Sequence, residues 1–126
     1  MIHEKALRVL LVDDHTLVRA GIRSLIEGRE GVRIVAEADN GRDAAALVRK
    51  HAPDVVLMDI SMPELNGIDA LLQILAQAPG TRVLMLSMHS AEEFVRRALR
   101  AGACGYLVKD SAPQELLLAL AAVARG

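Results

Sequence analysis

The pattern that most constrains this chain is a set of short apolar runs, each of which ends at a chemically reactive polar residue. The runs are RVLLVD, DVVLMD, RVLMLS and CGYLVK, at residues 8–13, 54–59, 82–87 and 104–109. They are short and rich in valine and leucine, as strands buried on both faces are. A fifth segment, VRIVAEA at 32–38, alternates apolar and polar residues and predicts a strand with one better covered face.

Segments with helical spacing of their apolar residues separate these predicted strands. They cover residues 17–26, 41–51, 68–75, 91–101 and 112–125. Pro53 follows the second segment and Gly102 follows the fourth, and both residue types are typical of helix ends. Five strands that alternate with five helices predict an α/β fold in which helices cover both faces of a parallel sheet.

Size and composition narrow the class of protein. The 126 residues suit a single domain, and 52% hydrophobic with 25% charged residues supplies ample core material. A formal net charge of −1 gives no bulk attraction to nucleic acid or to an anionic membrane, and no apolar run approaches the length of a membrane span. Cys104 is the single cysteine, which excludes an intrachain disulfide and suits the cytoplasm; we expect this thiol to be buried.

The polar residues at the strand ends predict a functional site. They are Asp13 with Asp14, Asp59, Ser87 and Lys109. A core needs none of them, and the carboxyl ends of parallel strands meet at one edge of the sheet, where such folds bind ligands. Carboxylates that lie close together repel each other, and Mg²⁺ is the hard cation that best relieves this while accepting phosphate oxygens. The remaining carboxylate can then act as a nucleophile and form an aspartyl phosphate.

These segments resemble the receiver domain of bacterial two-component response regulators over essentially the whole chain, 1–126. The resemblance rests on VDDH at 12–15, LMDISMPELNG at 57–67, MLSMH at 85–89 and GYLVKD at 105–110. It implies a flavodoxin-like (CheY-like) five-stranded parallel sheet with strand order 2-1-3-4-5. It also implies a domain that catalyses only its own phosphorylation and dephosphorylation and is not otherwise an enzyme.

The resemblance assigns a role to each matching residue. Asp59 corresponds to the phosphoacceptor, and Mg²⁺ would be held by Asp13, Asp14, Asp59 and the backbone carbonyl of Ser61. Ser87 and Lys109 correspond to the residues that contact the phosphoryl group, and Tyr106 to the aromatic ring that turns inward when Ser87 moves. His89, two residues after Ser87, is predicted from its position alone to modulate phosphoryl lifetime.

One departure from the family pattern concerns Lys109. Many receivers have proline next, after a cis bond, whereas this chain has Asp110, and a cis bond before a residue other than proline costs about 3 kcal/mol. Asp110 and the preceding GACGYL resemble the NarL/FixJ subfamily. That resemblance implies a sensor histidine kinase as partner, a phosphorylation-dependent homodimer, and a LuxR-type helix-turn-helix domain in the parent protein, through which alone DNA would be bound.

Several alternatives remain open from the sequence. His15 follows the acidic pair and is interpreted as a residue that caps or lines the first helix, with metal ligation as the alternative. Leu116, Leu117, Leu118 and Leu120 cannot all face the sheet, so part of the last helix is covered by a partner or remains an apolar surface. Competing functions are an aspartate-nucleophile phosphatase of the haloacid dehalogenase type, a flavodoxin-like cofactor binder, and a degenerate receiver.

Overall fold

The computed structural model describes residues 6–29, 31–59, 67–87, 92–108 and 113–125 of the chain. Strands and helices alternate without exception along these segments. In chain order the elements are β1 (Leu7–Val12), α1 (Thr16–Glu27), β2 (Val32–Ala38), α2 (Gly41–His51), β3 (Val55–Asp59), α3 (Gly67–Gln77), β4 (Arg82–Ser87), α4 (Glu92–Arg100), β5 (Gly105–Val108) and α5 (Pro113–Arg125).

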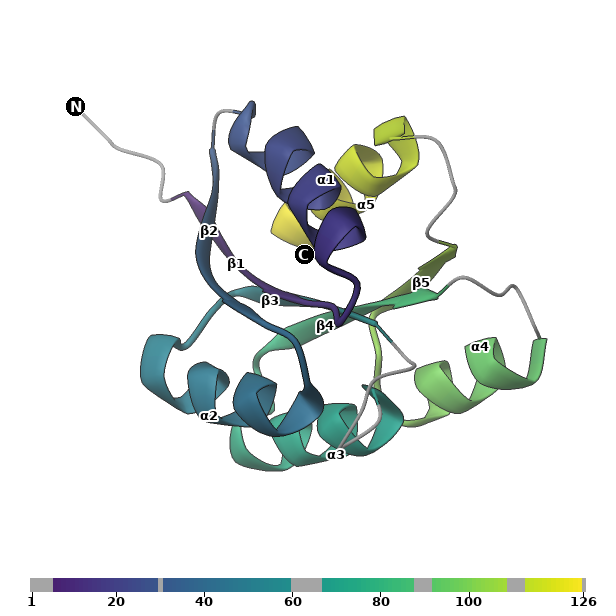
Figure 1. The fold of residues 1–126 in the computed structure, drawn as a ribbon. Coiled ribbons are helices and arrows are strands. Elements are labelled where there is room, and N and C mark those ends of the chain that lie inside the picture. Colours follow the sequence, from purple (N-terminus) through teal and green to yellow (C-terminus); the bar gives the residue numbers. More distant parts are fainter. Residues whose placement is uncertain (1–5, 30, 60–66, 88–91, 109–112, 126) are drawn as a thin grey trace.

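The five strands form one parallel sheet with the order β2-β1-β3-β4-β5. Helices α1 and α5 cover one face, and α2, α3 and α4 cover the other (Figure 1). The predicted fold class, strand order and double covering are therefore confirmed. The strand order reverses between β1 and β3. Open α/β sheets bind their ligands at such a reversal, just beyond the carboxyl ends of the strands.

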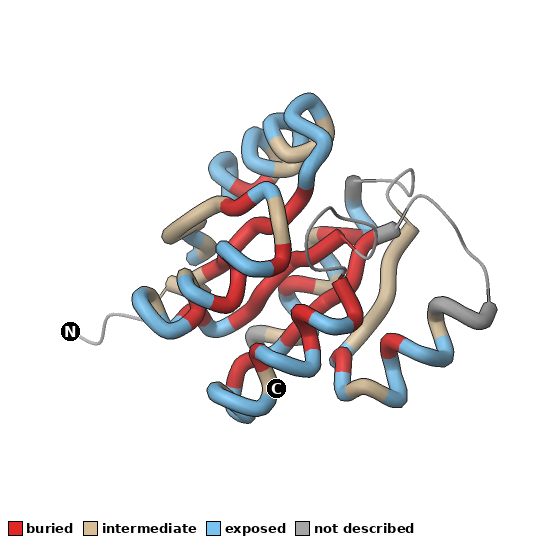
Figure 2. The backbone as a smooth tube through the Cα atoms, turned by 60° about the horizontal axis from the view of Figure 1, so that its bottom comes forward, coloured by how far each residue is buried: buried red, intermediate tan, exposed pale blue. Residues whose placement is uncertain are grey.

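Alternation along the strands divides the core into two apolar layers. In β1, Val9 and Leu11 pack in the layer under α1 and α5, whereas Leu10 and Val12 pack in the layer under α2, α3 and α4. Every residue of β3 is buried, because this strand is central and covered on both sides. Figure 2 shows the buried residues concentrated in the central strands and along the inward sides of the helices.

The edge strands are less well covered than the central ones. All four residues of β5 have intermediate exposure, and β2 is mostly intermediate as well. The β1–β2 pairing shifts between Val9 and Leu10, so that Val35 is an extra residue on the outer strand, a bulge of the kind common at sheet edges.

Local sequence explains where α2 begins and ends. The Asn40 side chain accepts a hydrogen bond from the Asp43 backbone N–H at 2.8 Å, which satisfies one of the free donors of the first turn. Ala52 adopts a left-handed conformation with φ 46°, and Pro53 then prevents the helix from continuing. The chain is thereby redirected into β3, which carries Asp59.

Candidate functional site

Strand register brings two acidic residues together at the carboxyl end of the sheet. Val12 of β1 lies opposite Met58 of β3 in the parallel pairing. Asp13 directly follows Val12, and Asp59 directly follows Met58 as the last residue of β3. The two acids therefore lie side by side where these strands end. The Asp13 N–H donates to the Ala38 carbonyl of β2 at 3.0 Å, which continues the sheet pairing as far as this acid.

Asp14 and His15 complete a compact group with these two carboxylates. One ligand atom from each of Asp13, Asp14, His15 and Asp59 lies within 4.8 Å of the others. His15 Nδ1 is 3.1 Å from Asp13 Oδ1, 3.2 Å from Asp14 Oδ1 and 3.6 Å from Asp59 Oδ2. The prediction that Asp13, Asp14 and Asp59 converge is therefore correct as a statement of geometry.

Burial of these carboxylates close together destabilises the folded state. Asp13 has 0% and Asp59 2% relative exposure, whereas the Asp14 side chain is 30% exposed. The Oδ2 atoms of Asp13 and Asp59 are both shielded from solvent. Like charges in a weakly solvated place repel one another, and a divalent cation with oxygen ligands relieves that repulsion. The donor set, three carboxylates with two of them buried, thus fits Mg²⁺.

Arg19 of α1 fixes the backbone from which the acidic pair projects. Its Nη1 donates to the Asp13 carbonyl at 2.6 Å, and its Nε lies 3.2 Å from a Glu37 oxygen on β2. Arg23, one turn later, also pairs with Glu37 at 2.7 Å. Sequence reasoning missed Arg19, because its partner Glu37 is distant in the chain and only the folded sheet brings the two together.

Of the other predicted site residues, the structure describes Ser87 and Tyr106. Ser87 is the last residue of β4 and pairs with Val108 of β5, which places its backbone at the same edge of the sheet as Asp59. Tyr106 of β5 is partly buried and packs against the core layer under α2, α3 and α4. Ser61, His89, Lys109 and Asp110 lie outside the described residues.

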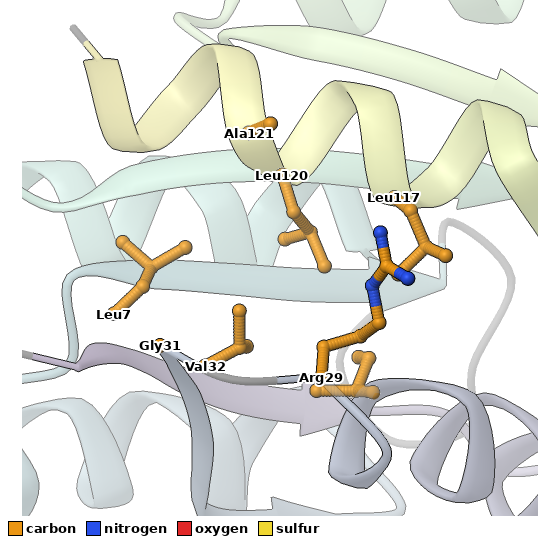
Figure 3. Close-up of a pocket in the computed structure, with 8 residues that line it drawn as sticks. Leu7, Arg29, Gly31, Val32, Leu117, Leu120 and Ala121 are labelled. Carbon is orange, nitrogen blue, oxygen red and sulfur yellow. The ribbon is translucent and has the colours of Figure 1, made fainter.

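An apolar hollow of about 230 Å³ lies at the opposite end of the strands. Leu7 and Val32, the first residues of β1 and β2, line it together with Leu117 and Leu120 of α5, and Arg29 extends along its rim (Figure 3). The described residues that line it are predominantly aliphatic, and none of them is an acid. These described lining residues therefore offer burial, whereas those at the carboxyl end offer oxygen ligands.

Comparison with known proteins identifies the family. The sequence profile of the response regulator receiver domain matches residues 9–121. The chain belongs to the response regulator receiver family. Response regulator UvrY of Escherichia coli K12 is 44% identical over 120 residues, which are 95% of this chain and 55% of UvrY.

Solved structures agree with this membership. The receiver domain of the putative response regulator NarL from Mycobacterium tuberculosis is 36% identical, with a TM-score of 0.93 and coverage of 98% of this chain and 99% of that one. A CheY of Borrelia burgdorferi, solved with CheX, BeF₃ and Mg²⁺, is 29% identical, with a TM-score of 0.89 and coverage of 94% and 90%.

The relatives define the subfamily and the class of activity. UvrY and NarL are regulators of the NarL/FixJ type, as the residues around Asp110 predicted. Receiver domains regulate transcriptional and signalling proteins and are not classical enzymes. The chain spans about half the length of the curated relatives it matches. Within the described residues, no helix is both long and apolar enough to cross a membrane.

The structure refines the interpretation of His15 and corrects the expectation for Cys104. His15 occupies the N-cap position of α1, in agreement with the interpretation that it caps or lines this helix, although its side chain makes no capping hydrogen bond and Nδ1 lies 3.1 Å from Asp13 Oδ1. Cys104 was expected to be buried and is exposed, because it precedes the thinly covered edge strand β5. Neighbouring protein atoms nevertheless desolvate the thiol enough to raise its pKa. On α5, Leu116 and Leu120 are buried while Leu118 is 69% exposed, which confirms that the leucines do not all face the sheet.

Proposed function

We propose that Asp59 is the phosphoacceptor of a receiver domain that a sensor histidine kinase phosphorylates. The observation that carries the proposal is the placement of Asp59, nearly inaccessible to solvent at the end of β3, beside Asp13 and Asp14. A strand end holds the carboxylate rigidly, and the neighbouring acids supply oxygen ligands for the cation that phosphoryl transfer requires.

Phosphoryl transfer to Asp59 would exchange a P–N bond for a P–O bond. A carboxylate oxygen of Asp59 attacks the phosphorus of a phosphohistidine, a P–O bond forms and the P–N bond breaks. The histidine of the kinase leaves with the electron pair and takes up a proton. Mg²⁺, when bound, would neutralise negative charge on the carboxylates and the phosphoryl oxygens. Asp13 and Asp14 would hold it together with Asp59 and, by the family pattern, the Ser61 carbonyl.

The remaining residues are proposed to sense the product. Ser87, at the end of β4, would donate its hydroxyl to a phosphoryl oxygen, and Lys109, which follows β5 in the sequence, would neutralise another. Tyr106, packed at the edge of the core, would change orientation as Ser87 moves, and His89 would influence how long the phosphoryl group persists. Phosphorylation would thereby shift an equilibrium between two conformations.

The output would be a changed surface in the cytoplasm. We propose that the active conformation favours a homodimer and controls a helix-turn-helix domain of the parent protein, through which alone DNA is bound. The exposed Leu118 on α5 is an apolar side chain that such a contact could cover. No feature of the described residues favours the haloacid dehalogenase, flavin or degenerate alternatives.

Incubation with acetyl phosphate and Mg²⁺ followed by intact-mass measurement tests the acceptor role. The protein should gain one phosphoryl group, Asp59→Asn should gain none, and chelation of Mg²⁺ should prevent the gain. Asp54→Asn is the matched control, because Asp54 is an exposed acid immediately before the same strand. An unchanged wild-type mass, while a known receiver treated in parallel gains the group, would refute the proposal.

A further inference from the structure

Elements that are distant in the sequence build the apolar hollow at the amino end of the strands. Ile26 in the last turn of α1 has 0% relative exposure and Leu120 of α5 has 2%, so these two side chains form its floor. Leu120 points from α5 toward the first residues of β1 and β2 (Figure 3). Gly31 and Ala121 line the hollow and are exposed, which places its mouth at the protein surface. The hollow is therefore an apolar depression that a ligand can enter from solvent.

Arg29 supplies a positive charge at the edge of this apolar surface. The residue is exposed, follows α1 in the chain and extends its guanidinium toward Leu117 of α5 (Figure 3). In the part of the chain that the structure describes, no acid forms an ion pair with this guanidinium. A guanidinium can bind a carboxylate through two parallel hydrogen bonds. The charge and the apolar floor together favour a ligand that has an aliphatic part and an anionic end.

The volume of the hollow, about 230 Å³, limits the length of that aliphatic part. An apolar cavity of about 150 Å³ is large enough to hold benzene, so this volume suits a chain of about six to eight carbon atoms. Aliphatic side chains offer water no hydrogen bonds, whereas each methylene group of a ligand gains free energy when it leaves water. A wholly apolar occupant would leave the guanidinium unpaired beside it, and a carboxylate would not.

We propose that the hollow binds a medium-chain aliphatic carboxylate of about six to eight carbon atoms. The chain would lie over Ile26 and Leu120, and the carboxylate would accept hydrogen bonds from the Arg29 guanidinium. A charged group at the rim of an apolar pocket fixes the orientation of the ligand. The ligand would contact α1 and α5 at the opposite end of the strands from Asp59, so the inference does not rest on the proposed phosphoryl transfer.

Titrations of the purified protein with octanoate, hexanoate, 1-octanol and acetate separate the two parts of this recognition. Methyl-selective carbon–proton NMR gives both the affinity and the place of binding. Octanoate should bind saturably, with a dissociation constant below about 1 mM. Hexanoate should bind at least about threefold more weakly because it buries fewer methylene groups, and 1-octanol about threefold more weakly because it lacks the charge. Acetate, which has the charge without the chain, should cause no saturable shift.

Substitution of the arginine tests the proposed charge pairing. Arg29→Gln should weaken octanoate binding about threefold and leave 1-octanol binding unchanged, because only the carboxylate uses the guanidinium. Arg97→Gln is the matched control: it removes the same charge from an exposed position on α4, on the other face of the sheet, and should change neither affinity.

A second substitution tests the hollow itself. Ala121→Leu enlarges an exposed residue that lines the hollow, and should weaken octanoate and 1-octanol alike by at least about fivefold. Ala122→Leu makes the same change at the next exposed position of α5, which is not part of the lining, and should have no effect.

The wild-type spectrum reports the location without any substitution. Octanoate should shift the methyl resonances of Leu117 and Leu120, and should leave those of Leu72 and Leu99, exposed leucines of α3 and α4, in place.

Four outcomes would overturn the inference. The first is a wild-type protein that shows no saturable octanoate binding, and the second is equal weakening by Arg29→Gln and Arg97→Gln. The third is a set of shifts at Leu72 and Leu99 as large as those at Leu117 and Leu120. The fourth is binding that occurs only after residues 1–5 are deleted, which would assign the hollow to the amino-terminal segment of the chain.

Discussion

The two ends of the parallel strands carry opposite chemistry on the same scaffold. At the amino end, Leu7, Val32 and Leu120 surround an apolar hollow, and what they contribute is burial. At the carboxyl end, Asp13 and Asp59 are buried as deeply as Leu120, and more deeply than Leu7 and Val32, but they bring negative charge with them. The first arrangement stabilises the fold, whereas the second opposes it unless a cation is present. A protein that keeps the second arrangement sacrifices stability for a site, a trade-off common at functional positions.

The largest expected effect is a loss of stability when a buried side chain at the amino end of the strands is truncated. Leu120 is 2% exposed and packs in the layer under α1 and α5, so Leu120→Ala should lower the free energy of unfolding by about 3 kcal/mol. The adjoining hollow cannot collapse fully around the smaller side chain, which adds a cavity cost to the lost burial. Urea denaturation measures the change. Leu118→Ala, at a 69% exposed position of the same helix, should stay within about 0.5 kcal/mol of wild type.

At the carboxyl end of the strands, a substitution is expected to increase stability, by a smaller amount. Asp59→Asn removes one buried negative charge beside Asp13 and Asp14, and should raise the metal-free stability by about 1 to 2 kcal/mol. Thermal unfolding with a chelator present gives the comparison. Asp43→Asn is the control, because Asp43 is exposed in the first turn of α2, where a negative charge is favourable. A loss of stability in Asp59→Asn would contradict the view that this end is costly.

Mg²⁺ that binds at the carboxyl end should stabilise the folded protein, and more strongly the higher its affinity for the site. An ion that binds only the folded state at ten times its dissociation constant stabilises a protein by about 1.4 kcal/mol. We therefore expect Mg²⁺ to raise the unfolding temperature of the wild type, and to do so less in Asp13→Asn, which removes a buried acidic ligand. Ca²⁺-free buffers and differential scanning calorimetry make the comparison direct. Equal stabilisation of both proteins would place the ion elsewhere.

The smallest expected effect concerns the glycine that leads into β2. Gly31 borders the apolar hollow with φ 81°, a conformation that strains any residue with a Cβ atom, although a Cβ there would meet nothing within 4 Å. Gly31→Ala should cost about 1 kcal/mol from backbone strain alone. Gly21→Ala, also in open space but within α1, should instead stabilise the protein by a similar amount. Urea denaturation of both variants checks the sign.

The acidic end of the sheet and several element boundaries could be predicted from the sequence, whereas the apolar hollow at the amino end could not. The boundaries of β2, α2 and β4 were predicted as the structure has them, because apolar periodicity and Pro53 are local signals. The meeting of Asp13 and Asp59 followed from the rule that parallel strands end at one edge. The strand order came from the family resemblance, since nothing local states which strands are neighbours.

Other features depended on tertiary contacts and could not be predicted. The orientation of the His15 ring is set by the neighbouring carboxylates, and the pairing of Arg19 with Glu37 by the approach of α1 to β2. Cys104 was misjudged because its apolar neighbours in sequence suggested a buried strand, whereas β5 lies at the edge of the sheet. The roles of Ser61, Ser87, His89, Tyr106 and Lys109 stay predictions.

The central claim, that Asp59 itself accepts the phosphoryl group, is tested most directly by mapping the modified residue. The protein is phosphorylated with acetyl phosphate and Mg²⁺, the acyl phosphate is reduced with borohydride to homoserine, and the digested peptides are sequenced by mass spectrometry. We predict homoserine at position 59 and unmodified aspartate at positions 13 and 14. Homoserine at 13 or 14, or a phosphoryl group retained on a histidine while position 59 remains aspartate, would contradict the account.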